Sequence, residues 1–279
     1  MVPFRQKHSD TSNDLELLGE GRTNIESSAI LRSILRLWER ACFSFLTHVK
    51  FRARSDAAAR IMITHRKDGN RTWPIIPTHL GRVLDLGCGN GDALSEQQTE
   101  GRALLVGLDV DAGRTTLASQ SGMRASFCCG SGDALPFADA SFDAVFSRVA
   151  LPYMNIPKAL SEVYRVLRPE GEVWLSFHRF GFGWSRLLNS LAHLRLQDAL
   201  FRGYVIANGV WFECAGRNFA WPLNRKRYES VQSESGILRA LARAGFQSCA
   251  ITQKRPLVLV GNKPAQTGTA HDSEDQQVA

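Results

Sequence analysis

Short apolar segments alternate with helical patterns from residue 82 onward, and this alternation limits the fold more than any other feature of the chain. The β-rich runs "RVLDLG", "ALLVGLDV", "FDAVFSR" and "EVWLSF" are separated by stretches typical of helices, over 112–120 and 156–167. Nearly continuous apolar strands joined by helices are typical of a parallel sheet covered on both faces. The helical "GILRALARAGF" then precedes "SCAITQK" and "PLVLVGN", which predict a closing pair of strands. We therefore expect an α/β domain with a doubly wound, mostly parallel sheet.

The first of these strands leads into a glycine-rich turn, "DLGCGNGD". Gly87, Gly89 and Gly91 remove the side chains that would keep a ligand away from the backbone, next to the positive start of a helix. The spacing GxGxG differs from the dinucleotide motif GxGxxG, and no Gly-Lys-Ser/Thr follows to make a P-loop. Because Asp85 would repel a diphosphate, the turn favours a ligand with a cationic amino group.

Two more carboxylates follow strands that neighbour this one along the chain. Asp109 ends the next strand, where a carboxylate can accept both hydroxyls of a ribose, and Asp111 is the alternative for that role. Asp133 lies in the loop after the third strand and can accept a hydrogen bond from an adenine amino group. Together with the turn, this order predicts a nucleoside ligand.

Four segments carry a resemblance to a known family: "VLDLGCGNG", "VGLDVD", "GDALPFADASFDAVFS" and "ALSEVYRVLRPEGEVWLSF". They resemble the successive motifs of class I S-adenosylmethionine-dependent methyltransferases, and are most similar to the type 11 methyltransferase domain, a group that includes ubiquinone/menaquinone-biosynthesis C-methyltransferases. The resemblance covers residues 80–177 well and 234–262 more loosely. It implies a Rossmann-like sheet of seven strands with an antiparallel last strand, S-adenosyl-L-methionine as cofactor, and methyl transfer to a small-molecule acceptor.

The resemblance also implies a set of cofactor contacts, carried over position by position. Those that would meet the methionine moiety are Asp85, Gly87, Cys88 and Gly89. Those that would meet the ribose and the adenine are Asp109, Val110, Asp133 and Ala134. Arg148 would line the space near the methyl sulfonium. Two segments depart from the family: "LPYMN" replaces a segment that is often rich in histidine, and "PEG" replaces the common turn "PGG", which should alter only the turn.

Two residues are candidates for a general base. The implied reaction is an in-line displacement at the sulfonium methyl, so positioning of the reactants supplies much of the catalysis. A hydroxyl or carbon acceptor would also need a base. His178 and Tyr153 follow strands that end at the cofactor cleft, and His178 is preferred because its ordinary pKa lies nearer neutrality. A cleft-lining role for His178 stays open, Glu162 and Arg165 are expected to form a structural pair, and no metal cluster is evident.

Residues 178–233 interrupt the alternation and are rich in aromatic and basic side chains. We interpret them as an inserted cap because ordinary connections are much shorter. Its aromatics either form a small core of their own or also line a ligand pocket. The composition indicates a hydrophobic or aromatic acceptor that carries a carboxylate or phosphate.

The expected domains are an N-terminal segment with a helical extension (1–74), the methyltransferase domain (75–263) and a disordered tail (264–279). The pattern over 28–50 predicts a basic amphipathic helix that packs on the main domain or, as an alternative, contacts a membrane surface. A second helix is expected near 55–66, followed by a turn at "KDGN".

Composition limits the remaining alternatives. The formal net charge is +7, there are six cysteines without a CxxC pair, and no apolar run is long enough to span a bilayer. We expect a cytoplasmic protein with buried, reduced thiols. The alternative functions are a non-catalytic methyltransferase-like partner subunit and an RNA or DNA methyltransferase. For the latter there is no clear nucleic-acid motif, and "ALPY" lacks the polar first residue and second proline of the amino-methylating enzymes.

Overall fold

The structure, a computed structural model, describes residues 63–265 apart from 69–70, 78, 98–102, 179 and 255. All of them belong to the second of two compact units of the chain, Ala53–Ala279. The amphipathic helix predicted over 28–50, the polar segment before it and most of the predicted tail lie outside the described residues.

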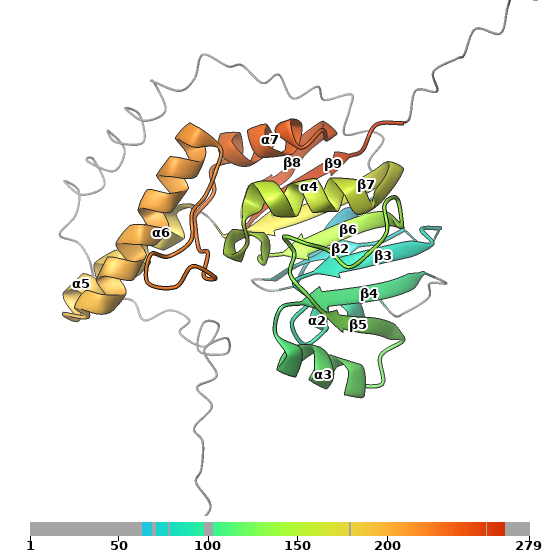
Figure 1. Ribbon diagram of the computed structural model, residues 1–279, viewed down its shortest axis with the longest axis horizontal. Helices are drawn as coiled ribbons and strands as arrows, with labels where there is room; N and C mark the ends of the chain where they lie inside the picture. The colour runs from blue at the N-terminus through green and yellow to red at the C-terminus, as the bar shows by residue number, and fades with distance from the viewer. Residues whose placement is uncertain are drawn as a thin grey trace, which may run out of the picture. The chain divides into compact units, whose positions relative to one another are not determined.

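A seven-stranded sheet in the order β5-β4-β3-β6-β7-β9-β8 forms the centre of this unit (Figure 1). The strands are β3 (Arg82–Leu86), β4 (Leu104–Asp109), β5 (Ala125–Cys129), β6 (Phe142–Arg148), β7 (Leu167–Phe177), β8 (Gln247–Lys254) and β9 (Leu257–Asn262). The pairs from β5 to β7 are parallel, and β9 is antiparallel to both β7 and β8. The predicted Rossmann-like sheet with an antiparallel last strand is therefore confirmed.

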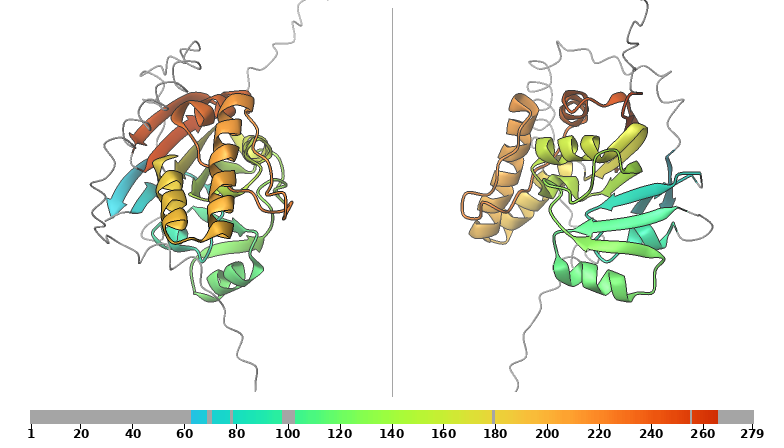
Figure 2. Two further views of the ribbon diagram at one scale, coloured as in Figure 1. Left: turned by 90° about the vertical axis from the view of Figure 1, so that its left-hand side faces the viewer. Right: turned by 45° about the vertical axis from the view of Figure 1, so that its right-hand side comes forward.

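Helices between the strands cover the sheet. They are α2 (Asp92–Ser95), α3 (Ala112–Gln120), α4 (Ile156–Val166) and α7 (Glu234–Arg243), with a 3₁₀ turn η2 at Leu151–Tyr153. Figure 2 shows α4 and α7 together over one face of the sheet. The predicted helices over 112–120 and 156–167 match α3 and α4 to within one residue.

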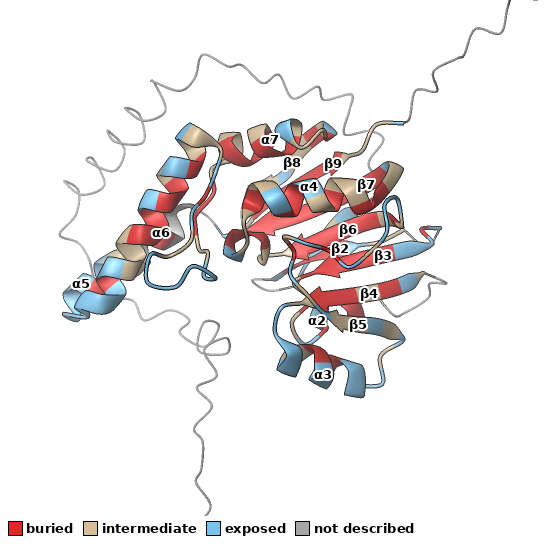
Figure 3. Ribbon diagram, in the orientation of Figure 1, coloured by how far each residue is buried: buried red, intermediate tan, exposed pale blue. Residues whose placement is uncertain are grey.

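The alternation of side chains along each strand divides the core between the two faces. Leu84 and Leu86 belong to the cluster that includes the apolar sides of α4 and α7. Val83, directly before Leu84 and so on the opposite face of the strand, belongs to a second cluster, which contains Trp73 and Leu94. Figure 3 shows buried residues along the central strands and the inward sides of α4 and α7. The sheet is thus buried on both faces, as its apolar strands predict.

A hairpin of β1 (Thr64–Asp68) and β2 (Arg71–Ile75) precedes the sheet. The helix predicted near 55–66 is therefore wrong at residues 64–66, and of the predicted turn at 67–70 the first two residues belong to β1 while the other two lie outside the described residues. Tertiary contacts explain the difference: Trp73 is buried in the second core cluster, and the backbone N–H of Ile63 donates to the Glu172 carboxylate over 2.8 Å. The boundary predicted at residue 74 falls inside β2.

The predicted cap contains two helices, α5 (Phe180–Ala192) and α6 (Leu196–Ala215), which pack against each other (Figure 1). An irregular segment leads from α6 through 216–233 to α7.

Candidate active site

The carboxyl ends of β3, β4, β5 and β6 lie at one edge of the sheet, because these strands are parallel. The turn after β3 has left-handed backbone at Gly87 (φ 79°), Gly89 (φ 55°) and Gly91 (φ 85°). A Cβ on Gly87 would lie 2.1 Å from the Cβ of Ala150, so the loop after β6 approaches this turn closely. Only glycine satisfies both the dihedral angle and this contact.

Asp85 lies at the end of β3, 1% exposed, and its Oδ2 has no hydrogen-bond partner among the described residues. The pKa of this carboxyl is raised to about 8. Burial is the main cause, the charges of Asp109 and Asp92 add to it, and the charge of Arg148 opposes it. An unpaired buried carboxyl oxygen is costly unless a ligand completes it. The donor it calls for is a cationic group, which fits the ammonium of the methionine moiety of S-adenosylmethionine.

Asp109 and Asp111 differ clearly in their surroundings. Asp109 accepts the backbone N–H of Gly89 at Oδ2 (2.9 Å) and that of Asp111 at Oδ1 (3.0 Å). It thereby ties the glycine turn to the end of β4. Asp111 caps α3: its Oδ1 accepts the backbone N–H groups of Gly113 (2.9 Å) and Arg114 (3.1 Å). Backbone N–H groups thus hold both carboxylates, that of Asp109 at the glycine turn and that of Asp111 at the start of a helix.

The predicted adenine contacts lie in the loops that follow β4 and β5. Val110, directly after Asp109, is 76% exposed. Asp133 accepts the backbone N–H of Asn155 over 3.1 Å, and burial raises the pKa of its carboxyl despite that bond. The N–H of Ala134 donates to the carbonyl of Ser131 in the same loop (3.2 Å).

Cys88 is buried beneath the turn, and burial, followed by the charges of Asp85 and Asp109, raises the pKa of its thiol. It is therefore a packing residue with an unreactive thiol. The prediction of buried thiols holds for Cys88 and Cys249 but is wrong for Cys129 and Cys214, which are exposed. Cys42 lies outside the described residues.

Arg148 ends β6, and its guanidinium carbon lies 4.5 Å from the centre of the Trp73 ring. This contact orients the cation at the same edge of the sheet as Asp85. The next residue, Val149, has φ 59°, which is rare for a β-branched side chain and marks strained backbone at the site. Trp73 was missed by the sequence reasoning, because the hairpin that carries it was not expected.

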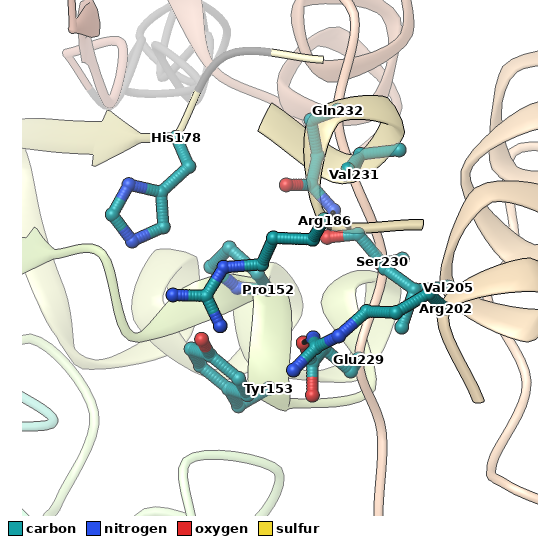
Figure 4. A pocket seen from close by; sticks show the side chains of 11 residues that line it. Pro152, Tyr153, His178, Arg186, Arg202, Val205, Glu229, Ser230, Val231 and Gln232 are labelled. Carbon is teal, nitrogen blue, oxygen red and sulfur yellow. Dashed lines mark hydrogen bonds and ion pairs between the residues drawn. The ribbon is translucent and has the colours of Figure 1, made fainter. Parts of the chain in front are cut away.

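A pocket of about 420 Å³, which includes space open to solvent, adjoins this edge and brings the two predicted base candidates together (Figure 4). Its described lining comes from η2, the end of β7, α5, α6 and the segment before α7. The lining residues are Pro152, Tyr153, His178, Gly183, Arg186, Arg202, Val205, Glu229, Ser230, Val231 and Gln232. Tyr153 and His178 lie far apart in sequence, and meet because β6 and β7 are neighbours in the sheet.

The two candidates differ in protonation. Desolvation by the surrounding protein lowers the pKa of His178, and the charges of Arg186 and Arg148 lower it further, although the side chain keeps access to solvent. The imidazole is therefore neutral at pH 7 and can accept a proton. Desolvation raises the pKa of Tyr153, and the charge of Glu229 adds to this, so its hydroxyl stays protonated and can donate a hydrogen bond.

Aromatic side chains of the cap pack mainly on one another. Tyr204 lies 4.8 Å from Trp221 and 5.5 Å from Phe219 between ring centres, and Phe201 lies 5.3 Å from Trp221. Tyr204, Val205 and Val231 form a small separate core with these rings against it. Of the two alternatives for the cap aromatics, the described side chains thus favour a core of the cap itself.

Asn208, which was not singled out from the sequence, holds the cap together. It is fully buried on α6, donates to the carbonyls of Phe219 (3.0 Å) and Glu229 (2.9 Å), and accepts the N–H of Phe219 (2.9 Å). No local sequence pattern indicates this role, because the backbone groups that Asn208 contacts are 11 and 21 residues away along the chain. Arg165 and Glu162 form the expected structural pair through two contacts of 2.8 Å.

Metal and membrane features were searched over the part of the chain that the structure describes. No group of three or more His, Cys, Asp or Glu side chains could hold a metal ion there. None of the described helices is long and apolar enough to cross a membrane.

Comparison with known proteins agrees with this geometry. The methyltransferase domain family matches residues 84–175. A malonyl-[acyl-carrier protein] O-methyltransferase of Pectobacterium atrosepticum is 33% identical over 110 residues, which are 39% of this chain and 43% of the relative. A demethylmenaquinone methyltransferase of Roseiflexus castenholzii is 38% identical over 101 residues, 35% of this chain and 42% of the relative.

The chain thus spans less than half the length of these curated relatives. Among solved structures, an S-adenosylmethionine dependent methyltransferase from Mesorhizobium loti is 20% identical, with a TM-score of 0.43, over 67% of this chain and 92% of that one. The family assignment is carried by the sequence matches, which cover the strands and turns at the candidate site. Residues 84–175 of the chain thus match the methyltransferase domain family, and the matched segment contains the glycine turn and the strand ends of the candidate site.

Proposed function

We propose that this protein transfers a methyl group from S-adenosylmethionine to a small-molecule acceptor. The observation that carries the proposal is the buried carboxyl oxygen of Asp85, which has no hydrogen-bond partner in the described part of the chain and lies beside a glycine turn, at the same edge of the sheet as Asp109 and Asp133. A nucleoside with an ammonium group supplies what this edge lacks. When bound, the cofactor supplies an activated methyl group on a sulfonium.

The residues of the chain divide the work of holding the reactants in line. Asp85 would bind the ammonium, Asp109 the ribose hydroxyls, and Asp133 the adenine amino group. The bare turn at Gly87 and Gly89 allows the ligand to lie close to the backbone. Fixing two reactants in line in this way supplies much of the rate enhancement for such a displacement.

His178 would act as the general base for a hydroxyl or carbon acceptor. It is neutral at pH 7, lines the pocket next to the turn and can take a proton at an imidazole nitrogen. Tyr153 would donate a hydrogen bond to the acceptor. The names of the relatives, which act on malonyl-[acyl-carrier protein] or demethylmenaquinone, support an organic acceptor but differ in its kind. An aromatic or hydrophobic acceptor stays within the proposal.

Calorimetric titration with S-adenosylmethionine tests the proposal on the wild type and on Asp109→Ala. We expect binding by the wild type and a loss of about tenfold or more in the variant, because hydrogen bonds to a charged group contribute about 1.5–3 kcal/mol. Asp198→Ala, which removes an exposed carboxylate in the first turn of α6, is the matched control and should bind like the wild type.

Absence of binding by the wild type would reject the enzymatic function in favour of a non-catalytic partner subunit. Tight binding that Asp109→Ala leaves unchanged would move the ribose contact elsewhere, with Asp111 as the next residue to substitute.

A further inference from the structure

The hairpin that precedes the sheet brings an aromatic side chain to the cofactor edge. Trp73 on β2 is 3% exposed and belongs to the second core cluster, together with Val83 of β3. The guanidinium carbon of Arg148 lies 4.5 Å from the centre of the Trp73 ring. The hairpin therefore contacts a charged residue at the end of β6.

The strand register places Arg148 and Asp85 on this same face of the sheet. Asp85 is paired with Phe146 in the parallel ladder, and Arg148 follows Phe146 by two residues. Side chains two residues apart point to the same face, and Phe146 belongs to the same core cluster as Trp73. Burial is the main cause of the raised pKa of Asp85, and the charge of Arg148 opposes it. The two groups are therefore close enough to interact.

The indole of Trp73 has a feature that packing alone does not explain. Its buried Nε1–H has no hydrogen-bond acceptor among the described residues, and an unsatisfied buried donor destabilises the folded state. A phenylalanine would bring an apolar ring without that donor. What the indole adds is the ring that attracts a cation most strongly. The contact with Arg148 thus gives a reason for tryptophan at this position.

A guanidinium held by a ring can still bind a ligand. Its five N–H donors form a planar fork that matches a carboxylate, and the attraction to a π face needs no acceptor atom. In S-adenosylmethionine a guanidinium would be repelled by the sulfonium and the ammonium, and attracted by the α-carboxylate. That carboxylate is bonded to the same carbon as the ammonium, for which Asp85 is proposed. The cation of Arg148 and the acid of Asp85 therefore match the two charged groups of one amino acid.

We propose that Trp73 is a positioning residue of the cofactor site, which holds Arg148 where its guanidinium binds the α-carboxylate of the methionine moiety. Asp85 and Arg148 then recognise the amino-acid end of the cofactor together. This inference rests on the proposed function, since it concerns the same cofactor. It moves Arg148 from the sulfonium, where the family resemblance puts it, to the carboxylate.

Calorimetric titration of the full chain tests this with S-adenosylmethionine and with decarboxylated S-adenosylmethionine, which keeps the ammonium and the sulfonium. We expect the wild type to bind the first about tenfold or more tighter, because a charge-assisted contact contributes at least this much. In Arg148→Gln this affinity ratio should fall to about one.

The role of Trp73 is read from the same ratio. Trp73→Met fills apolar space without a π face, and should lower the ratio by about threefold or more, the value of a cation–π contact. Trp73→Leu, a second variant without a π face, should do the same. Trp73→Phe keeps an aromatic face and should retain most of the ratio. Urea titration shows that each variant is folded.

Two exposed residues of the cap serve as matched controls. Trp211→Leu on α6 and Arg195→Gln directly before α6 should leave the ratio unchanged. A merely structural role of Trp73 would weaken both nucleosides equally, so an unchanged ratio in Trp73→Met and Trp73→Leu would overturn its positioning role. Equal binding of the two nucleosides by the wild type, or a ratio that survives Arg148→Gln, would overturn the carboxylate contact. If neither nucleoside binds the wild type, the proposed function itself fails.

Discussion

Asp85, at the end of β3, is fully buried, and one of its carboxyl oxygens has no hydrogen-bond partner among the residues that the structure describes. Leu84 and Leu86, on either side of it in the strand, are buried as well. Desolvation then favours the protonated acid, which is why its pKa rises to about 8. Binding of an ammonium group should reverse this by stabilising the carboxylate.

The affinity for S-adenosylmethionine should therefore depend on pH. Below pH 8 the free protein holds a proton on Asp85 that the bound carboxylate lacks, so binding releases a proton and strengthens as pH rises. We expect up to about a tenfold gain per pH unit between pH 6 and 7.5. Calorimetry in buffers of different ionisation enthalpy counts the released proton. Asp85→Asn should bind weakly and without this slope, and a slope that persists in it would assign the proton to another group.

Glu170, near the start of β7, has a backbone conformation that lowers the stability of the folded state. Its φ of 65° is left-handed, at the position where "PEG" replaces the family's "PGG". Such a conformation destabilises the folded state by about 1–2 kcal/mol when the residue is not glycine. A glycine avoids this strain, but it also makes the unfolded chain more flexible, which offsets part of the gain. We expect Glu170→Gly to raise the free energy of unfolding by about 0.5–1 kcal/mol in urea titrations.

The control for this substitution is Glu170→Ala, which removes the same exposed charge but keeps the strained dihedral angle. It should give no comparable gain. Equal stabilisation by both variants would attribute the effect to charge and not to the backbone.

The helix α6 buries a polar side chain whose partners lie outside the helix, so its packing could not be predicted from the residues of the helix alone. Its buried residues include Asn208, whose side chain joins the helix to the backbone at Phe219 and Glu229. Because Glu229 lines the pocket, this helix helps to set the position of a charged side chain in the pocket. The glycine turn, by contrast, depends on β3 and β4 and not on the cap.

Asn208→Ala should therefore weaken the cap and leave the cofactor edge intact. Loss of its partners leaves buried carbonyl and N–H groups unsatisfied, and we expect the free energy of unfolding to fall by about 2–3 kcal/mol. Hydrogen exchange should increase over 196–232, while the affinity for S-adenosylmethionine stays within about twofold of the wild type. Asn189→Ala, at an exposed position on α5, should change neither property. A large loss of cofactor affinity in Asn208→Ala would contradict this division.

At the scale of the whole described unit, the core is divided into two clusters on the faces of the sheet and a third, smaller one in the cap. The sheet clusters hold the strand ends that form the cofactor edge. Arg202 of the pocket lies over the Phe201 ring, which packs against the cap cluster. We expect the cap to open at a lower free energy than the sheet, because it buries fewer apolar side chains.

Much of this architecture could be predicted from the sequence because its signals are local. Apolar runs such as that of β6 and helix starts such as Asp111 and Asn155 are written in consecutive residues. The hairpin of β1 and β2 could not be predicted, because its strand conformation depends on the burial of Trp73 against distant strands. For the same reason the contact of Trp73 with Arg148 was missed.

The sequence by itself determined the doubly wound sheet, the glycine turn and the three carboxylates at its edge, since strand periodicity and glycine dihedral freedom are properties of the chain next to each residue. Only the tertiary structure decided that the described cap aromatics pack on one another, and that Arg186, Tyr153 and His178 surround one pocket. These depend on contacts between residues far apart in sequence, where charge, burial and hydrogen bonding are set by neighbours that no local pattern specifies.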